Sequence, residues 1–373
     1  MIQLVGRIPG RSGLWEMSVR ENRVERMSCR DDSFADPHGA WITPGLFDLQ
    51  INGIGGVSYT DAALTAEDVG RADALIRSGG VSRYAATIIS CSQETARSAL
   101  RALAAARVAG TAPGLWAVHL EGPWISAEEG TRGVHRREHV RDVSLEEWDA
   151  LQAAAGGMIR VLTLAPERSG AIELTARAAR AGTVVSLGHT SATAGIIAAA
   201  VRAGATMSTH LLNGCPQLLD RHSNVVYAQL SEDALDASFI ADGHHVPFPA
   251  LRMALRAKGI RRSILVSDLA HLSGLPEGDY QMEGNPVELR DGGLRVKGSP
   301  LLSGAVRTLA EDVQWLARQE EPGIEAALLM ATRNPAMVAG EAGWADLRPG
   351  REGPLAVFAW DGERLALRQR IGF

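Results

Sequence analysis

Several short apolar segments of this sequence end in residues that ionise or bind metals. One carboxylate and two imidazoles are a common ligand set for a catalytic Zn²⁺ that keeps an open position for water. A further carboxylate beside that water can accept its proton and later deliver it to a leaving nitrogen. The residues with these properties are Glu121, His189 and His210 as candidate ligands, and Asp268 as candidate general base. Their types predict metal-assisted hydrolysis of a bond to nitrogen.

Each histidine taken alone has a simpler interpretation. A single buried histidine is more often a hydrogen-bonded core residue than a metal ligand. The shared position of Glu121, His189 and His210 at the ends of predicted strands favours the metal site instead. His119 stands two residues before Glu121, on the same face of an extended strand, and its contact with the metal stays open.

The elements that must position these residues alternate between strand and helix patterns over residues 42–342. Short runs rich in Val, Ile and Leu are typical of parallel strands buried on both faces. Ala- and Arg-rich amphipathic stretches, several ending at Gly, lie between most of them. The pattern predicts a (β/α)8 TIM-like barrel, whose active site lies at the carboxyl ends of the strands. A Rossmann sheet is less favoured, because no GxGxxG motif follows an early strand. The predicted strands are Ile42–Ile51, Tyr84–Ser90, Leu115–Leu120, Ile159–Ala165, Val184–Gly188, Thr206–Leu211, Ala237–Ala241 and Ile264–Ser267.

The two ends of the chain read as short strands separated by turn residues. Residues 1–41 and 343–373 are each too short to bury a core alone. We therefore predict one small β domain built from both ends, beside a barrel domain of residues 42–342.

Composition restricts the class of partner. The chain is 46% hydrophobic and 22% charged with a net charge of −5, so no global positive field attracts nucleic acid or an anionic membrane. No segment reaches 18 consecutive apolar residues, and the first residues lack the apolar core of an export signal. Three cysteines without CxxC spacing fit a reducing compartment, so we expect a cytoplasmic protein.

The motifs around these residues resemble those of N-acetylglucosamine-6-phosphate deacetylases, members of the amidohydrolase superfamily. They occur in that family's order over about residues 43–316. The resemblance implies the barrel and a small flanking β-sandwich from the terminal segments. The segments that carry it are Pro44–Gly56, His119–Trp124, Gly133–His139, Leu187–Thr193, Thr209–Asn213, Ala241–Val246 and Leu265–Asp268.

The resemblance also implies a mechanism. Glu121, His189 and His210 match the family's metal ligands and Asp268 its general base and acid, while a metal-bound water attacks the acetamide carbonyl. His135 matches the residue that helps to stabilise the developing oxyanion.

Two residues with amide side chains determine how many metal ions we expect in each subunit. Many amidohydrolases open with a His-x-His pair that helps to hold a second metal, and here Gln50 and Asn52 occupy those positions. Amides are poor ligands beside imidazoles, so we expect one divalent ion per subunit, with Zn²⁺ favoured over Fe²⁺, Co²⁺ and Mn²⁺.

The predicted substrate is a phosphorylated N-acetyl amino sugar. In the family, the residue that matches Arg221 can come from the neighbouring subunit, which implies a homodimer; without the resemblance, Arg221 beside Asp220 reads as a loop salt bridge. The residues that the resemblance assigns to the sugar phosphate are Val134, Asn213, Gly214, Arg221, His245, Leu302, Ser303 and Gly304.

The sequence departs from the family on the sugar side only. Ala305 replaces a hydroxyl, Arg307 is a cation at an apolar position, and the loop Arg221–Val225 lacks a Glu-Pro-Gly. The roles of Arg307 and His244 stay open. The leading hypothesis is deacetylation of N-acetylglucosamine 6-phosphate to glucosamine 6-phosphate and acetate. The alternatives are the same reaction on N-acetylgalactosamine 6-phosphate or an unphosphorylated N-acyl sugar, and a non-catalytic homologue.

Overall fold

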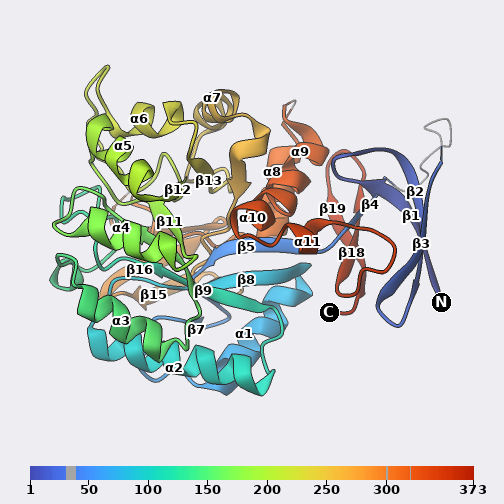
Figure 1. Cartoon of the computed structure of the whole chain (residues 1–373), viewed down its shortest axis with the longest axis horizontal. Coiled ribbons are helices and arrows are strands. Elements are labelled where there is room, and N and C mark those ends of the chain that lie inside the picture. Colours follow the sequence, from blue (N-terminus) through green and yellow to red (C-terminus); the bar gives the residue numbers. More distant parts are fainter. Residues whose placement is uncertain (31–38, 300, 320) are drawn as a thin grey trace.

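A nearly closed barrel of eight parallel strands forms the centre of the molecule (Figure 1). The computed structural model describes residues 1–30, 39–299, 301–319 and 321–373. Neighbours in the barrel follow one another in chain order from β5 to β14, as expected for repeated strand–helix units. The strands are β5 (Leu46–Ile51), β8 (Val81–Ile88), β9 (Leu115–Glu121), β10 (Ile159–Leu164), β11 (Val184–Leu187), β12 (Ala205–Ser208), β13 (Asp236–Phe239) and β14 (Ser263–Leu265).

Contacts beyond the strand ends join β5 to β14. The N–H of Asn52 donates to the carbonyl of Leu269 at 2.8 Å, next to a parallel bridge between Ile51 and Leu269. Asp48 Oδ1 accepts a hydrogen bond from the N–H of Ser267 at 3.2 Å. The Asp48 carboxylate thus supplies an acceptor where the two edge strands lack a continuous ladder.

Helices cover the outer face of the barrel, so its strands are buried on both sides (Figure 1). This explains why the strands are continuous apolar runs instead of alternating ones. Thr65 and Asp68 form a capping box at the start of α1. The helices are α1 (Ala66–Ser78), α2 (Gln93–Ala109), α3 (Leu145–Ala154), α4 (Ala171–Arg180), α5 (Ala194–Ala203), α6 (Val225–Ser231), α7 (Phe248–Lys258), α8 (Leu309–Ala317), α9 (Gly323–Met330), α10 (Arg333–Val338) and α11 (Ala342–Ala345).

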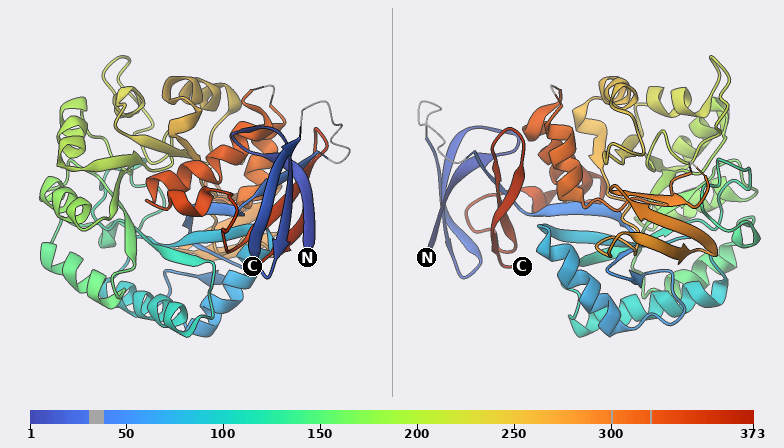
Figure 2. Two further views of the ribbon diagram at one scale, coloured as in Figure 1. Left: turned by 45° about the vertical axis from the view of Figure 1, so that its right-hand side comes forward. Right: turned by 180° about the vertical axis from the view of Figure 1, so that it is seen from behind.

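The two ends of the chain meet in a second unit at one side of the barrel (Figure 2). Its six strands have the order β19-β18-β4-β1-β2-β3, and β1 joins β4 through a single pair. Apolar residues from both halves, such as Met17 and Leu355, pack in a core of their own. The strands are β1 (Ile2–Ile8), β2 (Arg11–Arg20), β3 (Arg23–Arg30), β4 (Ala40–Thr43), β18 (Leu355–Trp360) and β19 (Leu365–Ile371).

The predicted barrel and the flanking β unit are confirmed, but the first predicted strand was wrong. Residues 42–51 form two strands, because the chain turns at Pro44 and Gly45 between β4 and β5. Gly45 has φ = 87°, and a Cβ there would lie 2.4 Å from Ser82 Oγ, so the turn needs a glycine. Residue 42 therefore lies inside β4 of the terminal sheet. The division of the chain at residues 41/42 and 342/343 stays a proposal.

A three-stranded antiparallel sheet follows β14 and was not predicted. It comprises β15 (Gly278–Met282), β16 (Asn285–Arg290) and β17 (Gly293–Val296), and it packs on a small apolar cluster of its own (Figure 2). A smaller hairpin pairs β6 (Gly53–Ile54) with β7 (Val57–Ser58). Among the described residues, no helix has the length and apolar character needed to cross a membrane.

Candidate active site

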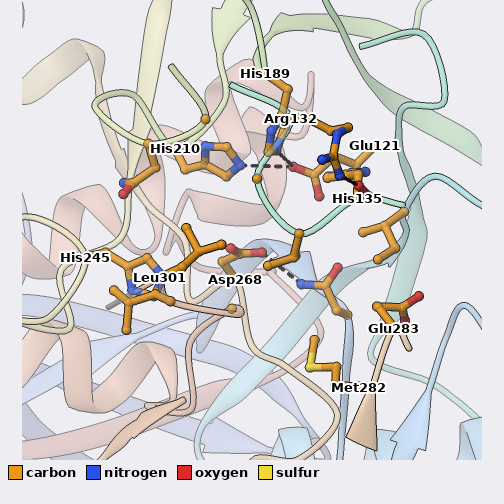
Figure 3. A pocket seen from close by; sticks show the side chains of 18 of the residues that line it. Glu121, Arg132, His135, His189, His210, His245, Asp268, Met282, Glu283 and Leu301 are labelled. Carbon is orange, nitrogen blue, oxygen red and sulfur yellow. Dashed lines mark hydrogen bonds and ion pairs between the residues drawn. The ribbon is translucent and has the colours of Figure 1, made fainter. Parts of the chain in front are cut away.

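The four residues predicted to do chemistry converge at the carboxyl ends of the barrel strands (Figure 3). Glu121 is the last residue of β9, and His189, His210 and Asp268 stand just beyond β11, β12 and β14. The last three have left-handed φ values of 49°, 29° and 49°. Such values are strained for residues other than glycine and concentrate at functional sites. The strand ends therefore turn sharply and bring these side chains into one cluster, in which Glu121, His189 and His210 are buried and Asp268 is half-buried.

Glu121, His189 and His210 form a compact ligand set. Glu121 Oε1 lies 3.1 Å from His189 Nε2 and 3.0 Å from His210 Nε2, and the three candidate ligand atoms lie within 4.8 Å of one another. His189 Nδ1 donates to the carbonyl of Thr131 at 2.9 Å, because a carbonyl can only accept. When the ring of His189 is neutral, as metal binding requires, its lone pair is then on Nε2, the atom that faces Glu121. This donor set fits a divalent ion such as Zn²⁺.

The protonation of Glu121 also suits a ligand. Burial would raise the pKa of Glu121, but hydrogen bonds and positive charge from His189 and His210 hold it well below its usual range. The carboxyl is therefore ionised, which is the form that binds metal.

Two amides connect the ligand set to the candidate base. Asp268 Oδ1 accepts hydrogen bonds from Gln50 Nε2 at 3.0 Å and Asn52 Nδ2 at 2.8 Å, and Gln50 Nε2 also lies 3.1 Å from Glu121 Oε1. Burial and the nearby charge of Glu121 raise the pKa of Asp268. Gln50 and Asn52 thus orient the two carboxylates, and one metal ion per subunit stays a prediction.

His135 is arranged as a neutral hydrogen-bond donor. Its Nδ1 accepts the N–H of Ser90 at 3.3 Å and lies 2.8 Å from Ser90 Oγ. Burial lowers the pKa of His135 to about 3, so the ring carries one proton at neutral pH. Since Nδ1 accepts, that proton is on Nε2, and His135 lines the cavity.

A cavity of about 510 Å³ opens beside these residues. This volume lies in the usual range for small-molecule sites. Ser303 does not line the cavity, because it is buried with its Oγ 3.8 Å from Met282 Sδ. Arg221 is exposed in the loop before α6 and does not line it either. The other residues predicted to bind the sugar phosphate do line it: Val134, Asn213, Gly214, His245, Leu302 and Gly304.

Asp242 fixes the orientation of His245. Asp242 Oδ2 lies 2.6 Å from His245 Nδ1, and Oδ1 accepts the N–H groups of His244 and His245, both at 2.8 Å. Burial would raise the pKa of Asp242, but these hydrogen bonds and the His245 charge lower it to about 2. His245 Nδ1 therefore donates to a permanent carboxylate, which leaves Nε2 free for a ligand.

His119 is a core residue, not a ligand. Its Nδ1 lies 3.1 Å from the carbonyl of Leu49 and its Nε2 lies 2.7 Å from Thr163 Oγ1, so both ring nitrogens are occupied. Burial lowers the pKa of His119 to about 4. The ring joins a buried chain of hydroxyls through Thr163 and Thr209. The question that the sequence left open is thus answered by the hydrogen bonds.

Sequence reasoning missed several residues that line the cavity. Met282 and Glu283 reach it from the turn between β15 and β16, and Arg132 reaches it from the segment after β9 (Figure 3). The signal for the first two was the turn pair Glu283-Gly284 within an alternating segment, which predicts a hairpin. No feature of the sequence predicts that this hairpin contributes to the site.

Relatives of known activity resemble most of the chain. It is 32% identical over 348 residues to N-acetylglucosamine-6-phosphate deacetylase of Bos taurus, covering 88% of this chain and 83% of the relative. It is 32% identical over 296 residues to N-acetylgalactosamine-6-phosphate deacetylase of Shewanella sp. (strain ANA-3), covering 79% and 73%. No protein-family model matches the sequence.

Solved structures agree with the sequence relatives. N-acetyl-D-glucosamine-6-phosphate deacetylase of Mycobacterium smegmatis superposes with a TM-score of 0.87 at 27% identity, covering 100% of this chain and 98% of that one. A mutant of that enzyme in complex with N-acetyl-D-glucosamine-6-phosphate superposes with a TM-score of 0.84 at 26% identity, covering 97% and 99%. Together with the barrel and its carboxylate-and-imidazole cluster, these similarities show that the chain belongs to the N-acetylglucosamine-6-phosphate deacetylase family of the amidohydrolase superfamily.

Proposed function

We propose that this protein removes the acetyl group from N-acetylglucosamine 6-phosphate, giving glucosamine 6-phosphate and acetate. The observation that carries the proposal is the cluster of Glu121, His189 and His210 at one end of a cavity that also holds Asp268. This set supplies both the ligands and the proton carrier that amide hydrolysis needs.

Each residue of the cluster has one task. Glu121, His189 and His210 would hold a divalent ion. Such an ion, when bound, would lower the pKa of a coordinated water and polarise a carbonyl oxygen. Zn²⁺ suits this donor set best, with Fe²⁺, Co²⁺ and Mn²⁺ as alternatives. Asp268 accepts the proton of the attacking water and delivers it to the leaving nitrogen as the C–N bond breaks.

His135 stabilises the reacting carbonyl oxygen. Its Nδ1 is occupied by Ser90, so its Nε2–H is the donor available to the substrate. A neutral donor whose ring is already fixed needs no reorganisation as negative charge develops on that oxygen.

The sugar occupies the remaining part of the cavity. The residues available to contact it there are Val134, Asn213, Gly214, His245, Leu302 and Gly304. His245 meets the phosphate through its free Nε2. Ser303 supports the wall from behind, because its side chain is buried.

The protein acts as a homodimer in this proposal. Arg221 is exposed outside the cavity, so it can meet a phosphate only in the site of a second copy. Leu218 in the same loop is 93% exposed, and Leu219 and Tyr227 are also exposed apolar residues nearby. Such a patch is typical of a surface covered by a partner. A cytoplasmic location is part of the proposal, and it is consistent with three free cysteines.

N-acetylgalactosamine 6-phosphate is the second candidate substrate. The relative from Shewanella, named for that sugar, and the bovine N-acetylglucosamine-6-phosphate deacetylase are each 32% identical to this chain. Ala305 and Arg307 also depart from the family on the sugar side. The two sugars differ only in the configuration at C4, so only the sugar contacts can discriminate them.

A comparison of four substrates tests the proposal. We expect the highest kcat/KM on N-acetylglucosamine 6-phosphate, and lower values on N-acetylgalactosamine 6-phosphate and on the two unphosphorylated sugars. A higher value on the galactosamine ester would reassign the substrate. Metal-loaded protein that releases acetate from none of the four would support a non-catalytic homologue instead.

A further inference from the structure

One carboxylate oxygen of Asp48 holds together two backbone segments that lead to the candidate base. Asp48 is fully buried in β5, and its Oδ1 accepts the N–H of Gln50 and the N–H of Ser267, each at 3.2 Å. Gln50 belongs to the same strand, whereas Ser267 follows β14 and directly precedes Asp268. The contact therefore joins the strand that carries the amide to the segment that carries the base.

These contacts close a ring of hydrogen bonds around the Gln50 amide. The side chain of Gln50 donates from Nε2 to Asp268 Oδ1 at 3.0 Å, and its backbone N–H donates to Asp48 Oδ1. The residue before Asp268 donates its own backbone N–H to the same oxygen of Asp48. The donor and the acceptor of the Gln50–Asp268 hydrogen bond are thus both attached to backbone that Asp48 holds.

The backbone offers little else to connect these two segments. β5 and β14 are the two ends of the barrel sheet, and no ladder of backbone hydrogen bonds joins them in the described part of the chain. Direct backbone pairing begins further along, where the N–H of Asn52 donates to the carbonyl of Leu269 at 2.8 Å. The Ser267 hydroxyl adds one long contact, 3.4 Å to the carbonyl of Gln50. Asp48 therefore supplies the shorter hydrogen bonds at the point where the base is attached.

Keeping a carboxyl at position 48 costs stability. Asp48 is entirely buried, its Oδ2 has no hydrogen-bond partner among the described residues, and burial raises its pKa to about 7. A buried carboxyl with an unpaired oxygen is unfavourable unless its other contacts compensate. Proteins break such local rules mainly at functional sites. Because the contacts of Asp48 lead to the base, a functional role explains why a carboxyl stands there instead of an apolar side chain.

We propose that Asp48 is a positioning residue for catalysis, which keeps the Gln50 amide and the Asp268 carboxyl within hydrogen-bond distance by holding their backbones. This inference rests on the function proposed above. Asp48 does not line the cavity, so it acts on the substrate only through the residues that it holds. A general base must lie within hydrogen-bond reach of the proton that it accepts, and a displacement of about 1 Å can cost about 10²-fold in rate. Asp48 prevents such a displacement of Asp268.

Replacement of Asp48 should lower kcat and leave binding unchanged. We expect Asp48→Ala to lower kcat on N-acetylglucosamine 6-phosphate by about 10- to 100-fold, with KM within about twofold of the wild type. Asp48→Leu, which removes the acceptor but fills the space, should lose as much. Metal bound per chain should stay the same, because Asp48 bonds to Gln50 and Ser267 and not to the three metal ligands.

Two further variants distinguish positioning from a loss of stability. Asp48→Asn should recover most of the kcat, because its amide oxygen can accept the same two N–H groups. Asp73 supplies the matched control, since it is a buried aspartate on α1 whose Oδ1 accepts the N–H of Gly114 at 2.9 Å. Asp73→Ala should lower the free energy of unfolding without lowering kcat per folded chain. Equal losses of kcat in Asp48→Ala and Asp73→Ala would assign Asp48 a purely structural role.

A double-mutant cycle tests whether Asp48 acts through the base. When Asp48→Ala is added to Asp268→Asn, the residual kcat should change by less than about twofold, because the residue that Asp48 positions no longer transfers protons. Losses that multiply independently would overturn the proposal.

A crystal structure of Asp48→Ala separates this proposal from the proposed function, because it needs no turnover. We expect the distance between Gln50 Nε2 and Asp268 Oδ1, which is 3.0 Å here, to exceed the hydrogen-bond limit of about 3.5 Å. An unchanged distance would overturn the positioning role even in an active enzyme. A lengthened distance, together with a wild type that releases acetate from no N-acetyl sugar, would keep Asp48 as the residue that positions Asp268 and reject deacetylation.

Discussion

At the scale of single residues, Asp268 is the group on which proton transfer depends. Its Oδ1 accepts from Gln50 and Asn52, and this orients the carboxyl while leaving Oδ2 without a hydrogen bond to another described residue. Burial and the charge of Glu121 raise its pKa, which makes it a stronger base than an exposed aspartate.

Replacement of this base should stop turnover without removing the metal. We expect Asp268→Asn to lower kcat by about 10³-fold, because general acid–base groups typically contribute 10²- to 10⁴-fold. Asparagine keeps the shape and an acceptor for the two amides, so bound metal per chain should match the wild type. A fall in metal content parallel to the fall in kcat would make Asp268 a ligand instead of a base.

At the scale of elements, the segment after β12 fixes a ligand that belongs to β11. Gly214 has φ = 57°, and a Cβ there would lie 2.9 Å from His189 Nδ1. The same nitrogen donates to Thr131, so a displaced ring would lose this bond as well. The close approach of Gly214 thus positions His189 for the metal.

Gly214→Ala should weaken metal binding by about 10- to 100-fold, the usual effect of disturbing the outer hydrogen bond of a ligand. Competition with a chelator measures the change. Gly182→Ala is the matched control, since Gly182 has a similar positive φ of 82° with no heavy atom within 4 Å of its Cβ position. An equal loss of metal affinity in the two variants, relative to the wild type, would show that backbone strain weakens metal binding and that contact with His189 does not.

The turn after β13 contributes stability through Asp242. Its pKa in the folded protein is about 2, against an ordinary value of 3.8 for an aspartate side chain. A lowered carboxyl pKa stabilises the fold above the unfolded pKa, and the contribution disappears as the pH falls through the folded value. The difference is about 2 kcal/mol at neutral pH.

Asp242→Asn should therefore lower the free energy of unfolding by about 2 kcal/mol at pH 7. About half of this difference should be lost at pH 3. At that pH the Asp242 carboxyl binds a proton in the unfolded wild type but stays largely ionised in the folded form. Denaturant titrations of both proteins at the two pH values measure it. A difference that stays constant with pH would mean that the charge of Asp242 has no role.

Strands and turns differ in how well the sequence predicts their position. The eight barrel strands were predictable because strands buried on both faces are unbroken apolar runs between amphipathic helices. Glu121, His189, His210 and Asp268 were predictable because their strands all deliver side chains to one end. Met282 and Glu283 were not, since the hairpin that carries them is an insertion whose place depends on tertiary packing. The turn at Gly45 was hidden inside an apolar run.

At the scale of the whole molecule, the proposed dimer depends on a surface outside the active-site cavity. Leu218 is 93% exposed in the loop that carries Arg221, whereas Val108, at the end of α2, is 89% exposed on another part of the surface. A charge at a covered apolar position disrupts association, but at a solvated position it does not.

Leu218→Asp should therefore convert the dimer to a monomer, while Val108→Asp should leave it intact. Sedimentation velocity of the wild type and both variants measures the mass. We expect the dimer-to-monomer constant to rise by at least about 10-fold in Leu218→Asp only, by analogy with central interface residues. A wild type that sediments as a monomer at micromolar concentration would remove Arg221 from the substrate site.

The central claim is that one divalent ion, held by Glu121, His189 and His210, supports hydrolysis of an N-acetyl amino sugar phosphate. Its most direct test is stepwise addition of Zn²⁺ to chelator-treated protein, with acetate release from N-acetylglucosamine 6-phosphate measured at each step. We predict almost no release without metal, a linear rise, and a plateau at one bound ion per chain. Undiminished release by metal-free protein, or none by protein carrying its full complement of metal, would contradict the account.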